Sequence, residues 1–591
     1  MHARRSWCLV CGRALSAASK RATEGPHELS GGQTRAAASA ASTSGQSSDP
    51  QVTAAVAKRF DWRFIGLIGA TGAGALAAAS IFEKRRDDAE KPDPPGQVEG
   101  EDDTVLLNWS GTHECRPRRF FQPATQQQLE HLVKKAHKAG EKLRCVGSAL
   151  SPNGLAFSEE GLVSLQLMDK ILDINLATHQ VKVQAGVRVQ DLVDQLRPHG
   201  LTLQNFASIR EQTIGGFIQV SAHGTGAGIP PVDEQVVGMT LITPAEGTLT
   251  LSDDQDPKLF RMARVGLGAL GMVADVTLQC VPVHRLLEHT YVASVKEVRR
   301  KHHKWLRSNR HLRYMWIPYT DAVVVVTNNI IAEGVAPPKM KRSFSQDARV
   351  GPMRALLMED VPECQREEVW QMSWTELRDR LIALRPLDAA WIKRVNQAEA
   401  EFWKRSEGYR VGYSDELLGF DCGGQQWVLE VCFPTGTLQH NTGADLGYMA
   451  DLMQALEAAK VPAPSPIEQR WTSSSLSPLS PAHSLNKDDI FSWVGIIMYL
   501  GTDDPHVRND ITASFAKYAQ LEEAKIMPKY KAVEHWAKLE VDRSDGEALK
   551  KRIQLKYPTQ DFTAVRQRLD PKNILTNHIV EAVFPVNSQT A

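Results

Sequence analysis

Three glycine-rich segments lie between strand-like runs in the first half of the chain, and they restrict the fold more than any other feature. They are residues 144–154 (RCVGSALSPNG), 205–228 (NFASIREQTIGGFIQVSAHGTGAG) and 265–274 (VGLGALGMVA). Glycine lets the backbone turn sharply and approach another group closely, and free N–H groups beside it suit a diphosphate. Glycine loops between strands are more often plain turns than ligand cradles, so composition alone indicates a flavin or nucleotide site only weakly.

The third segment contains GLGALG at residues 266–271, which matches the spacing GxGxxG. A dinucleotide-binding fingerprint requires a helix to start at this point and an acidic residue about 20 positions later. Here the strand-like run VADVTLQC follows instead. We therefore do not expect a Rossmann site.

Helical and strand patterns alternate around the first glycine segment. Residues 125–140 (TQQQLEHLVKKAHKAG) predict a helix, because Thr125 and Gln128 form a capping box and Gly140 is a typical stop. A strand, LRCV, follows, and the pattern repeats through HQVKVQAGV and a helix around residues 189–196. Such alternation predicts α+β or α/β layers.

The balance of charged residues indicates which kinds of molecule the protein binds. The 591 residues contain 69 Lys plus Arg and 69 Asp plus Glu, so no overall field favours nucleic acid, and small neutral partners are favoured. Eight scattered cysteines are too few for a disulfide scaffold in a chain of this size. Cys8 and Cys11 form a single CxxC without a second pair, so we expect no metal site.

The first hundred residues read as targeting and attachment segments. Residues 1–60 are rich in Arg, Ala and Ser and poor in acids, which favours a mitochondrial presequence over a plastid signal or a disordered tail. The hydrophobic segment 61–83 includes 19 uncharged residues, Phe64 to Phe82, enough to span a membrane or to act as a sorting signal. Basic residues flank both ends, so the positive-inside rule does not orient it. The charged, Pro-rich segment 84–107 reads as a linker.

Several strings together resemble one family of flavoproteins, the aldonolactone oxidoreductase branch of the vanillyl-alcohol-oxidase type. They are NWSGTHE, VGSALSPNG, LTLQNFASIREQTIGG, AHGTGA, PIEQRW, DDIFSWVGIIMYL and EHWAK, spread from Asn108 to the C-terminus. The resemblance implies an α+β fold with a two-subdomain FAD-binding domain at 108–285. It also implies an α+β cap (substrate) domain at 286–550 and a C-terminal segment, 551–591, that returns to the FAD domain.

The resemblance also implies the residues that hold FAD. The turn after LRCV would cradle the diphosphate, and later residues would line the rest of the cofactor. The implied set is Val146, Gly147, Ser148, Ala149, Leu150, Ser151, Asn153, Ala207, Ser208, Ile209, Gly215, Gly216, Ser221, His223, Gly224 and Thr225.

The string PIEQRW contains two charged residues, Glu468 and Arg470, that are candidates for the catalytic site. In a strand, residues two apart share a face, so Glu468 and Arg470 would enter one pocket. Oxidising a lactone to an enediol removes two electrons and two protons, which calls for FAD as acceptor and for polar groups that orient the sugar hydroxyls. The resemblance implies that Glu468 binds the lactone and that Arg470 stabilises negative charge. An isolated ExR would more often be a surface ion pair.

Three further residues belong to the implied substrate side. His535 and Lys538, in EHWAK, match a family segment near the flavin and substrate, whereas a core histidine and a solvated lysine are the ordinary alternative. Cys422, in FDCGG, matches a cysteine near the substrate that makes family members sensitive to thiol reagents. Buried thiols are usually inert.

The resemblance implies oxidation of L-galactono-1,4-lactone to L-ascorbate, with cytochrome c as electron acceptor. Ala207 stands where oxygen-using relatives tend to have glycine, and its methyl group would close the path of oxygen to the flavin. The implied location is the inner mitochondrial membrane, on the intermembrane-space side. Two alternatives stay open: an oxygen-using oxidase of gulono- or arabinonolactone, and a partner of respiratory complex I or its assembly intermediates that retains FAD for folding.

Leu150 generates a test of cofactor attachment. In oxidase relatives this loop position is a histidine bonded covalently to the flavin, and leucine has no nucleophile, so the resemblance implies noncovalently bound FAD. Acid or heat denaturation should release all yellow colour into the supernatant, measured by absorbance after centrifugation. Flavin that stays with the precipitate would contradict noncovalent attachment.

Overall fold

A computed structural model describes residues 98–340, 342–420, 422–543 and 545–585. The predicted presequence, the hydrophobic segment and most of the predicted linker lie outside these residues. Leu106 and Leu107, at the end of that linker, form strand β1, which pairs with β2 (Glu114–Cys115). No helix within the described residues is both long and apolar enough to cross a bilayer.

The first glycine segment follows a small parallel sheet. Its three strands have the order β3 (Arg119–Phe121), β5 (Gly161–Ser164), β4 (Arg144–Val146). Helix α2 (Gln126–Ala139) has the predicted capping box of Thr125 and Gln128 and ends at Gly140 in the left-handed region, φ 72°. Leu129, Leu132 and Val133 form its buried face, so the predicted helix is confirmed.

The second glycine segment contains helix α4 (Ile214–Gln219), and the third leads into a strand of a neighbouring antiparallel sheet. Its order is β10 (Gly247–Ser252), β9 (Val236–Thr243), β11 (Met272–Gln279), β7 (Gln180–Gln184), β6 (Ile171–Asn175). Helices α3 (Val189–Leu196), α4 and α5 (Pro257–Ala263) and the two-stranded pair β8 (Leu201–Thr202) and β12 (Val281–Pro282) complete this part. GLGALG is followed directly by β11, so the absence of a fingerprint helix is confirmed.

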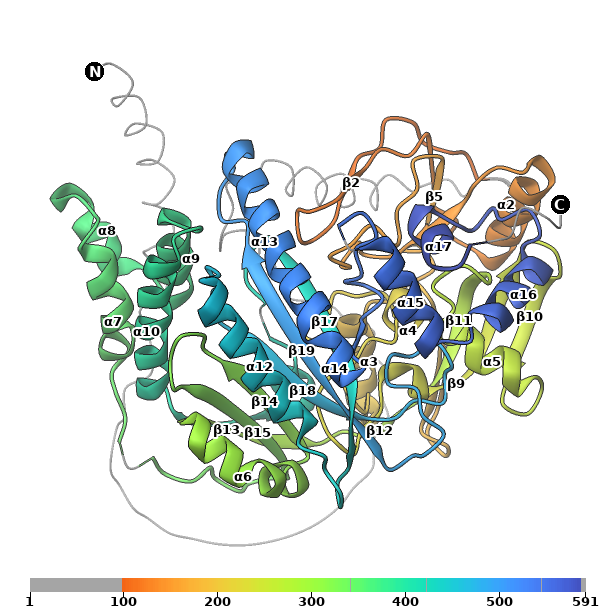
Figure 1. Ribbon diagram of the computed structural model, residues 1–591. Helices are drawn as coiled ribbons and strands as arrows, with labels where there is room; N and C mark the ends of the chain where they lie inside the picture. Colours follow the sequence, from red (N-terminus) through yellow and green to blue (C-terminus); the bar gives the residue numbers. More distant parts are fainter. Residues whose placement is uncertain (1–97, 341, 421, 544, 586–591) are drawn as a thin grey trace, which may run out of the picture. The chain divides into compact units, whose positions relative to one another are not determined.

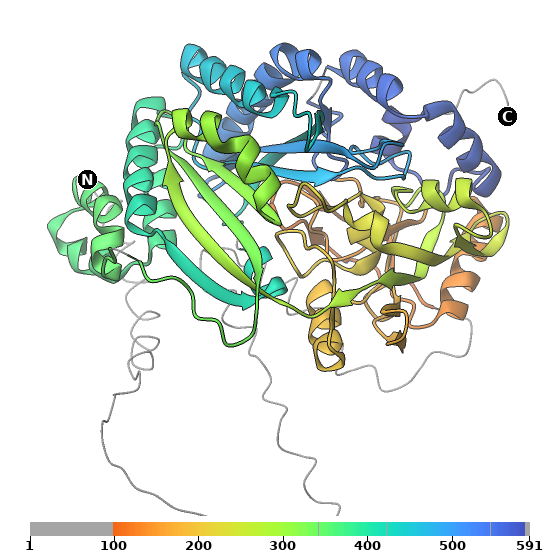
Figure 2. The ribbon, with the colours of Figure 1, turned by 90° about the horizontal axis from the view of Figure 1, so that it is seen from below.

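An eight-stranded antiparallel sheet forms the other half of the described chain (Figures 1 and 2). Its order is β16 (Gly408–Tyr413), β13 (Arg285–Ala293), β15 (Val323–Ile331), β14 (His311–Trp316), β18 (Ile467–Ser473), β19 (Asp489–Tyr499), β17 (Gln426–Thr437), β20 (Val533–Glu534). One face packs against helices α6 (Val295–Ser308), α12 (Ala444–Ala459) and α13 (Pro505–Lys525) through buried side chains such as Tyr314, Val431 and Trp471. The opposite face of the sheet is not covered by these helices and is available to line a binding site.

Four helices form an insertion at one end of this sheet. They are α7 (Gln346–Met358), α8 (Arg366–Gln371), α9 (Trp374–Leu384) and α10 (Ala389–Arg405), seen at the left edge of Figure 1. Their apolar residues, among them Met353, Leu377 and Ile392, form a separate core. This insertion includes most of residues 332–369, to which the sequence assigned no role.

The C-terminal helices α15 (Gly546–Lys556), α16 (Thr559–Leu569) and α17 (His578–Val583) pack with the glycine-rich half (Figure 1). Buried Arg144 donates to the carbonyl of Leu575 at 2.7 Å and to those of Leu155 and Leu267. The described part thus has the α+β class that we expected. Strand β13 begins at Arg285 and α15 at Gly546, close to the domain boundaries that we propose at 285/286 and 550/551.

Asn577 generates a stability prediction, because it is both the N-cap of α17 and a donor to the loop after β4. Its Nδ2 donates to the carbonyls of Gly154, Leu155 and Phe157 at 2.9–3.3 Å, and its Oδ1 accepts from Val580 N. Asn577→Ala should lower the free energy of unfolding by about 2–4 kcal/mol, since a cap and buried hydrogen bonds are lost together. Urea unfolding measures the change.

Ser345→Ala is the matched control for that variant. Ser345 is the exposed N-cap of α7, and its Oγ accepts from Ala348 N at 3.2 Å. It should cost about 1 kcal/mol, the value of a cap alone. Equal losses in the two variants would contradict the role of Asn577 in holding the loop.

Candidate active site

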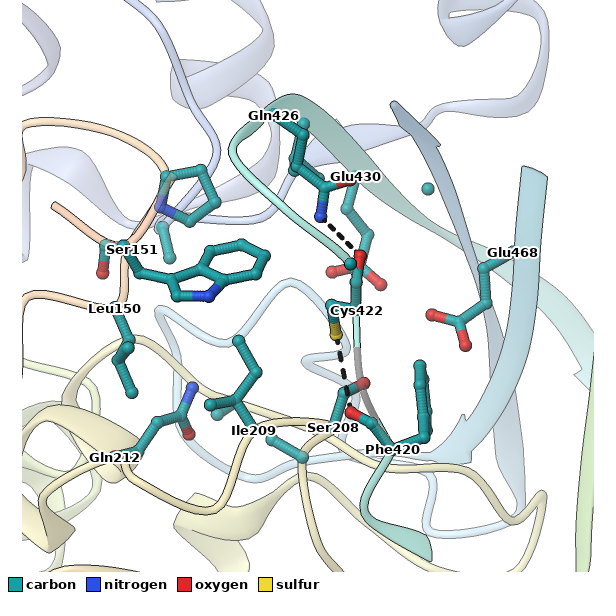
Figure 3. A pocket seen from close by; sticks show the side chains of 18 of the residues that line it. Leu150, Ser151, Ser208, Ile209, Gln212, Phe420, Cys422, Gln426, Glu430 and Glu468 are labelled. Carbon is teal, nitrogen blue, oxygen red and sulfur yellow. Dashed lines mark hydrogen bonds between the residues drawn. The ribbon is translucent and has the colours of Figure 1, made fainter. Parts of the chain in front are cut away.

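A cavity of about 940 Å³ lies between the glycine-rich half and the free face of the eight-stranded sheet. Figure 3 shows Leu150, Ser151 and Gln212 on one side of it and Glu430 and Glu468 on the other. Residues of the helical insertion, such as Trp374 and Arg378, also line the cavity. The volume and the mixture of apolar and polar lining suit a ligand of cofactor size.

The glycine-rich wall is a cradle in which the backbone itself faces the cavity. A Cβ added to Gly147 would lie 2.2 Å from Thr213 Oγ1, so the turn after β4 packs directly on the start of α4. Gly215 N donates to the carbonyl of Ala185 at 2.8 Å, and a Cβ on Gly216 would meet only Thr213 Oγ1, at 3.5 Å. Ser148 Oγ donates to the carbonyl of Glu211 at 2.7 Å and fixes the turn.

Twelve of the sixteen residues expected to hold the cofactor line the cavity. They are Val146, Gly147, Ser148, Ala149, Leu150, Ser151, Ala207, Ser208, Ile209, Gly215, Gly216 and His223.

The other four of these residues do not line this cavity and have structural partners. Asn153 donates to the carbonyls of Trp536 and Leu539, both at 2.8 Å, and Ser221 bonds to Asp233 and Ser480, both at 2.7 Å. Thr225 donates to the carbonyl of Leu312, and Gly224 packs on the backbone of Phe206. These contacts support neighbouring segments of the chain.

Strands of the eight-stranded sheet form the opposite wall of the cavity, because alternate side chains of each strand point to this face. Glu468 pairs with Met315 on β14 and Gly495 on β19, and Gly495 pairs with Glu430 on β17, so these residues form a row across the sheet. Glu468 and Arg470 both line the cavity, as the spacing in PIEQRW predicts, with Oε2 and Nε 3.2 Å apart.

Glu430 is the centre of this wall, and the sequence analysis did not select it. Its Oε1 lies 2.6 Å from Arg470 Nη2 and 3.2 Å from His223 Nε2, and its Oε2 lies 2.9 Å from Lys538 Nζ. Burial alone would raise the pKa of Glu430, but the charges of Lys538 and Arg470, together with the hydrogen bond from His223, outweigh burial and hold this pKa well below the usual value. A signal was present: Glu430 is the one charged residue in the apolar run WVLEVCF.

The two histidines beside Glu430 are held in their neutral form. Burial lowers the pKa of His223, whose ring stacks on Trp493 at 3.7 Å between centroids. Burial and then the charge of Lys538 place the pKa of His535 well below its usual value, and His535 Nδ1 accepts from Ala537 N at 3.0 Å. His223, Glu430 and His535 are close enough to bind a metal ion. We assign none, because Arg470 and Lys538 already place two positive charges on the same carboxylate.

Arg313 is a second residue that the sequence analysis missed. Its guanidinium lies 3.9 Å from the ring centroid of Phe420, and its Nη1 lies 3.5 Å from Glu468 Oε1. Burial lowers the pKa of Arg313. Burial would also lower the pKa of Arg470, but the charges of Glu468 and Glu430 outweigh burial and raise this pKa above its usual value. Glu468 is therefore held between two guanidinium groups.

Cys422 lies in the cavity wall between these groups and the cradle (Figure 3). Its Sγ donates to the carbonyl of Phe420 at 3.9 Å, and Gln426 Nε2 donates to the Cys422 carbonyl at 3.0 Å.

The cavity fits FAD on two observations. The turn at Gly147 leaves no room for a side chain, and at Gly216 only backbone lines the cavity, which suits the close approach of a diphosphate. Buried acceptor atoms Gln212 Oε1 and Gln426 Oε1 line the cavity and have no hydrogen-bond partner among the described residues, so they suit the donors of a ribityl chain or flavin ring.

Comparison with known proteins shows to which class of protein the chain belongs. Residues 117–252 match the family model of the FAD-binding domain, and residues 276–583 match that of D-arabinono-1,4-lactone oxidase. The described fold is similar to cholesterol oxidase from B. sterolicum, with a TM-score of 0.65 over 84% of this chain and all of that chain, at 16% identity. The protein is a flavoprotein oxidoreductase that binds FAD.

The sequence comparisons define the family more narrowly. The chain is 53% identical to the mitochondrial L-galactono-1,4-lactone dehydrogenase of Brassica oleracea over 505 residues, 83% of this chain and 84% of that one. It is 29% identical to L-gulonolactone oxidase of Bos taurus over 82% of this chain and 100% of that one. The chain belongs to the aldonolactone oxidoreductase family.

Gly147 generates the prediction for this site. Adding one methyl group at Gly147 forces Thr213 or the turn to move, and overpacking of this kind costs about 1–3 kcal/mol. Gly147→Ala should therefore raise the Kd of FAD by about tenfold or more, measured by titrating apoprotein with FAD. Gly228→Ala is the control, since nothing lies within 4 Å of its added Cβ. Equal FAD affinity in the two variants would contradict the cradle.

Proposed function

We propose that the protein oxidises L-galactono-1,4-lactone to L-ascorbate, the last step of ascorbate synthesis, and passes the electrons to cytochrome c. The observation that carries the proposal is the ion pair of buried Arg470 with partly buried Glu468, on the wall that faces the FAD cradle across one cavity. The relatives that are 52–53% identical to this chain are named L-galactono-1,4-lactone dehydrogenase, which supports the choice of lactone.

The cavity wall meets the needs of this oxidation. The reaction removes two electrons and two protons from the lactone, and FAD, when bound, supplies the acceptor for a hydride. Glu468 accepts hydrogen bonds from sugar hydroxyls and takes part in proton transfer. Arg470 donates to the oxygen on which negative charge develops, and Arg313 on the other side keeps Glu468 in place.

Lys538 and His535 complete the substrate side in this proposal. Lys538 Nζ lies on the same carboxylate as Arg470 and adds a second positive charge to the wall. His535 is neutral, so it offers a hydrogen bond without an added charge. Both residues act by orienting the lactone and balancing charge.

Cytochrome c and the cell compartment are also parts of the proposal. Ala207 lines the cavity beside the cradle, and its methyl group fits the closure of an oxygen path. The relatives of Brassica oleracea, Arabidopsis thaliana and Oryza sativa carry "mitochondrial" in their names. With the Arg-rich residues 1–60 and the apolar residues 61–83, we propose the inner mitochondrial membrane as the location, with the catalytic part on the intermembrane-space side.

Anaerobic reduction followed by reoxidation tests the function. Purified protein is mixed with L-galactono-1,4-lactone without air, and the flavin absorbance is followed. It is then exposed separately to air and to cytochrome c. Bleaching with fast recovery only by cytochrome c supports the dehydrogenase. Fast recovery in air would assign an oxidase instead, the activity named for the relatives of 27–29% identity. No bleaching with any aldonolactone would favour a structural partner of complex I that retains FAD.

The Glu468–Arg470 pair generates the mutational prediction. Glu468→Gln and Arg470→Lys should each lower kcat by about 100-fold, the effect of removing one group that stabilises developing charge. The flavin content should stay at the wild-type level, measured from the visible spectrum, because neither residue belongs to the cradle. Kinetics within twofold of wild type would remove both residues from the mechanism.

A further inference from the structure

Glu430 is a carboxylate in the middle of a buried strand, and every group that touches its oxygens is a cation or an imidazole. Arg470 lies at 2.6 Å, Lys538 at 2.9 Å and His223 at 3.2 Å, and only 5% of the Glu430 side chain is exposed. Placing a charge in such a site has a high desolvation cost. The cost is balanced only because two cations from separate elements meet on this carboxylate.

The geometry of Arg470 shows what this contact does. Arg470 Nη2 is held by Glu430, Nε lies 3.2 Å from Glu468 Oε2, and Nη1 donates to Ser208 Oγ at 3.3 Å. A planar guanidinium with partners on three nitrogens has one orientation. Glu430 is the closest of the three partners and lies deepest in the sheet.

Lys538 depends on Glu430 in the same way. It lies in the turn after β20 and pairs with Glu430 Oε2, whereas Arg470 pairs with Oε1, and Glu430 is its only ion-pair partner among the described residues. Because Lys538 is a flexible chain with a single charge, its direction is set by that partner. One carboxylate thus aims both cations into the cavity.

We propose that Glu430 is a positioning residue of the active site, which orients Arg470 and Lys538 and whose charge makes the bound flavin harder to reduce. The kinetic part rests on the proposed lactone oxidation, whereas the electrostatic part requires only FAD. The cluster has three cations, Arg313, Arg470 and Lys538, against Glu430 and Glu468. Neutralising Glu430 adds one net positive charge to the wall, and this favours the electron-rich reduced flavin.

Glu534 is a matched control on the adjacent strand. It is also a buried carboxylate paired with an arginine, Arg552, and it is paired in register with Val431, next to Glu430 on β17. It does not line the cavity. Glu534→Gln should therefore lower the melting temperature as Glu430→Gln does, without altering KM, kcat or flavin potential.

The first experiment is a double-mutant cycle with Glu430→Gln, Arg470→Lys and the double variant, in the full chain with FAD. Glu430→Gln should lower kcat for L-galactono-1,4-lactone by up to about 100-fold, the cost of misplacing a catalytic group. If Glu430 acts partly through Arg470, the double variant should be clearly faster than the product of the two single effects predicts. Effects that multiply, or equal kinetics of Glu430→Gln and Glu534→Gln, would overturn the proposal.

The second experiment measures the flavin midpoint potential without lactone, by photoreduction against a reference dye at about pH 6, where lysines carry their proton. Glu430→Gln should shift the potential to more positive values, and Glu534→Gln should not. An unchanged potential in Glu430→Gln would overturn the electrostatic part. A wild-type protein that no aldonolactone reduces would defeat the proposed function but would leave this comparison valid.

Glu430→Asp keeps the test decisive if the glutamine variant does not fold. Aspartate retains the charge but shortens the side chain by one methylene, so the potential should stay at the wild-type value while kcat falls. Wild-type kcat in Glu430→Asp would show that the position of the carboxylate is unimportant and would overturn the positioning role.

Discussion

The two faces of the eight-stranded sheet differ in chemistry, and the site depends on this difference. Side chains alternate along each strand, so Tyr314, Val431 and Trp471 pack on helices while Arg313, Glu430 and Arg470 face the cavity. The helices supply the burial energy that keeps the strands in register. A shift of one residue in β18 would turn Glu468 and Arg470 into the apolar core, so register and function are linked.

The ion pairs of Glu430 are strengthened by burial, because only 5% of its side chain is exposed. Exposed pairs contribute little to stability, and a buried carboxylate without partners would be neutral rather than charged. Glu430 remains ionised because Lys538 and Arg470 lie within 2.9 Å of it. These charges therefore act on a bound ligand with little screening by water.

The cradle on the other side is held from behind by the end of the chain. Arg144 and Asn577 bind main-chain carbonyls of the loop that follows β4 and of the C-terminal segment, and Leu143 N donates to the carbonyl of Ile574 at 2.7 Å. The glycine turn is thus rigid where a cofactor would lie. The observed contacts explain why a segment more than 400 residues away in sequence belongs to the same core.

The sequence alone determined the local elements and the identity of the chemistry. The helix after Thr125 has its capping box, GLGALG leads into a strand, and PIEQRW presents Glu468 and Arg470 on one face, because each feature depends on spacing within a few residues. Only the tertiary structure decided which groups surround this pair. Glu430, Arg313 and Lys538 come from strands and turns far apart in the chain, and their meeting depends on the strand order of the sheet, which no local pattern contains. The same holds for Asn153 and Ser221, which the family resemblance places among the cofactor residues: only the structure shows that their side chains bond to the carbonyl of Trp536 and to Asp233.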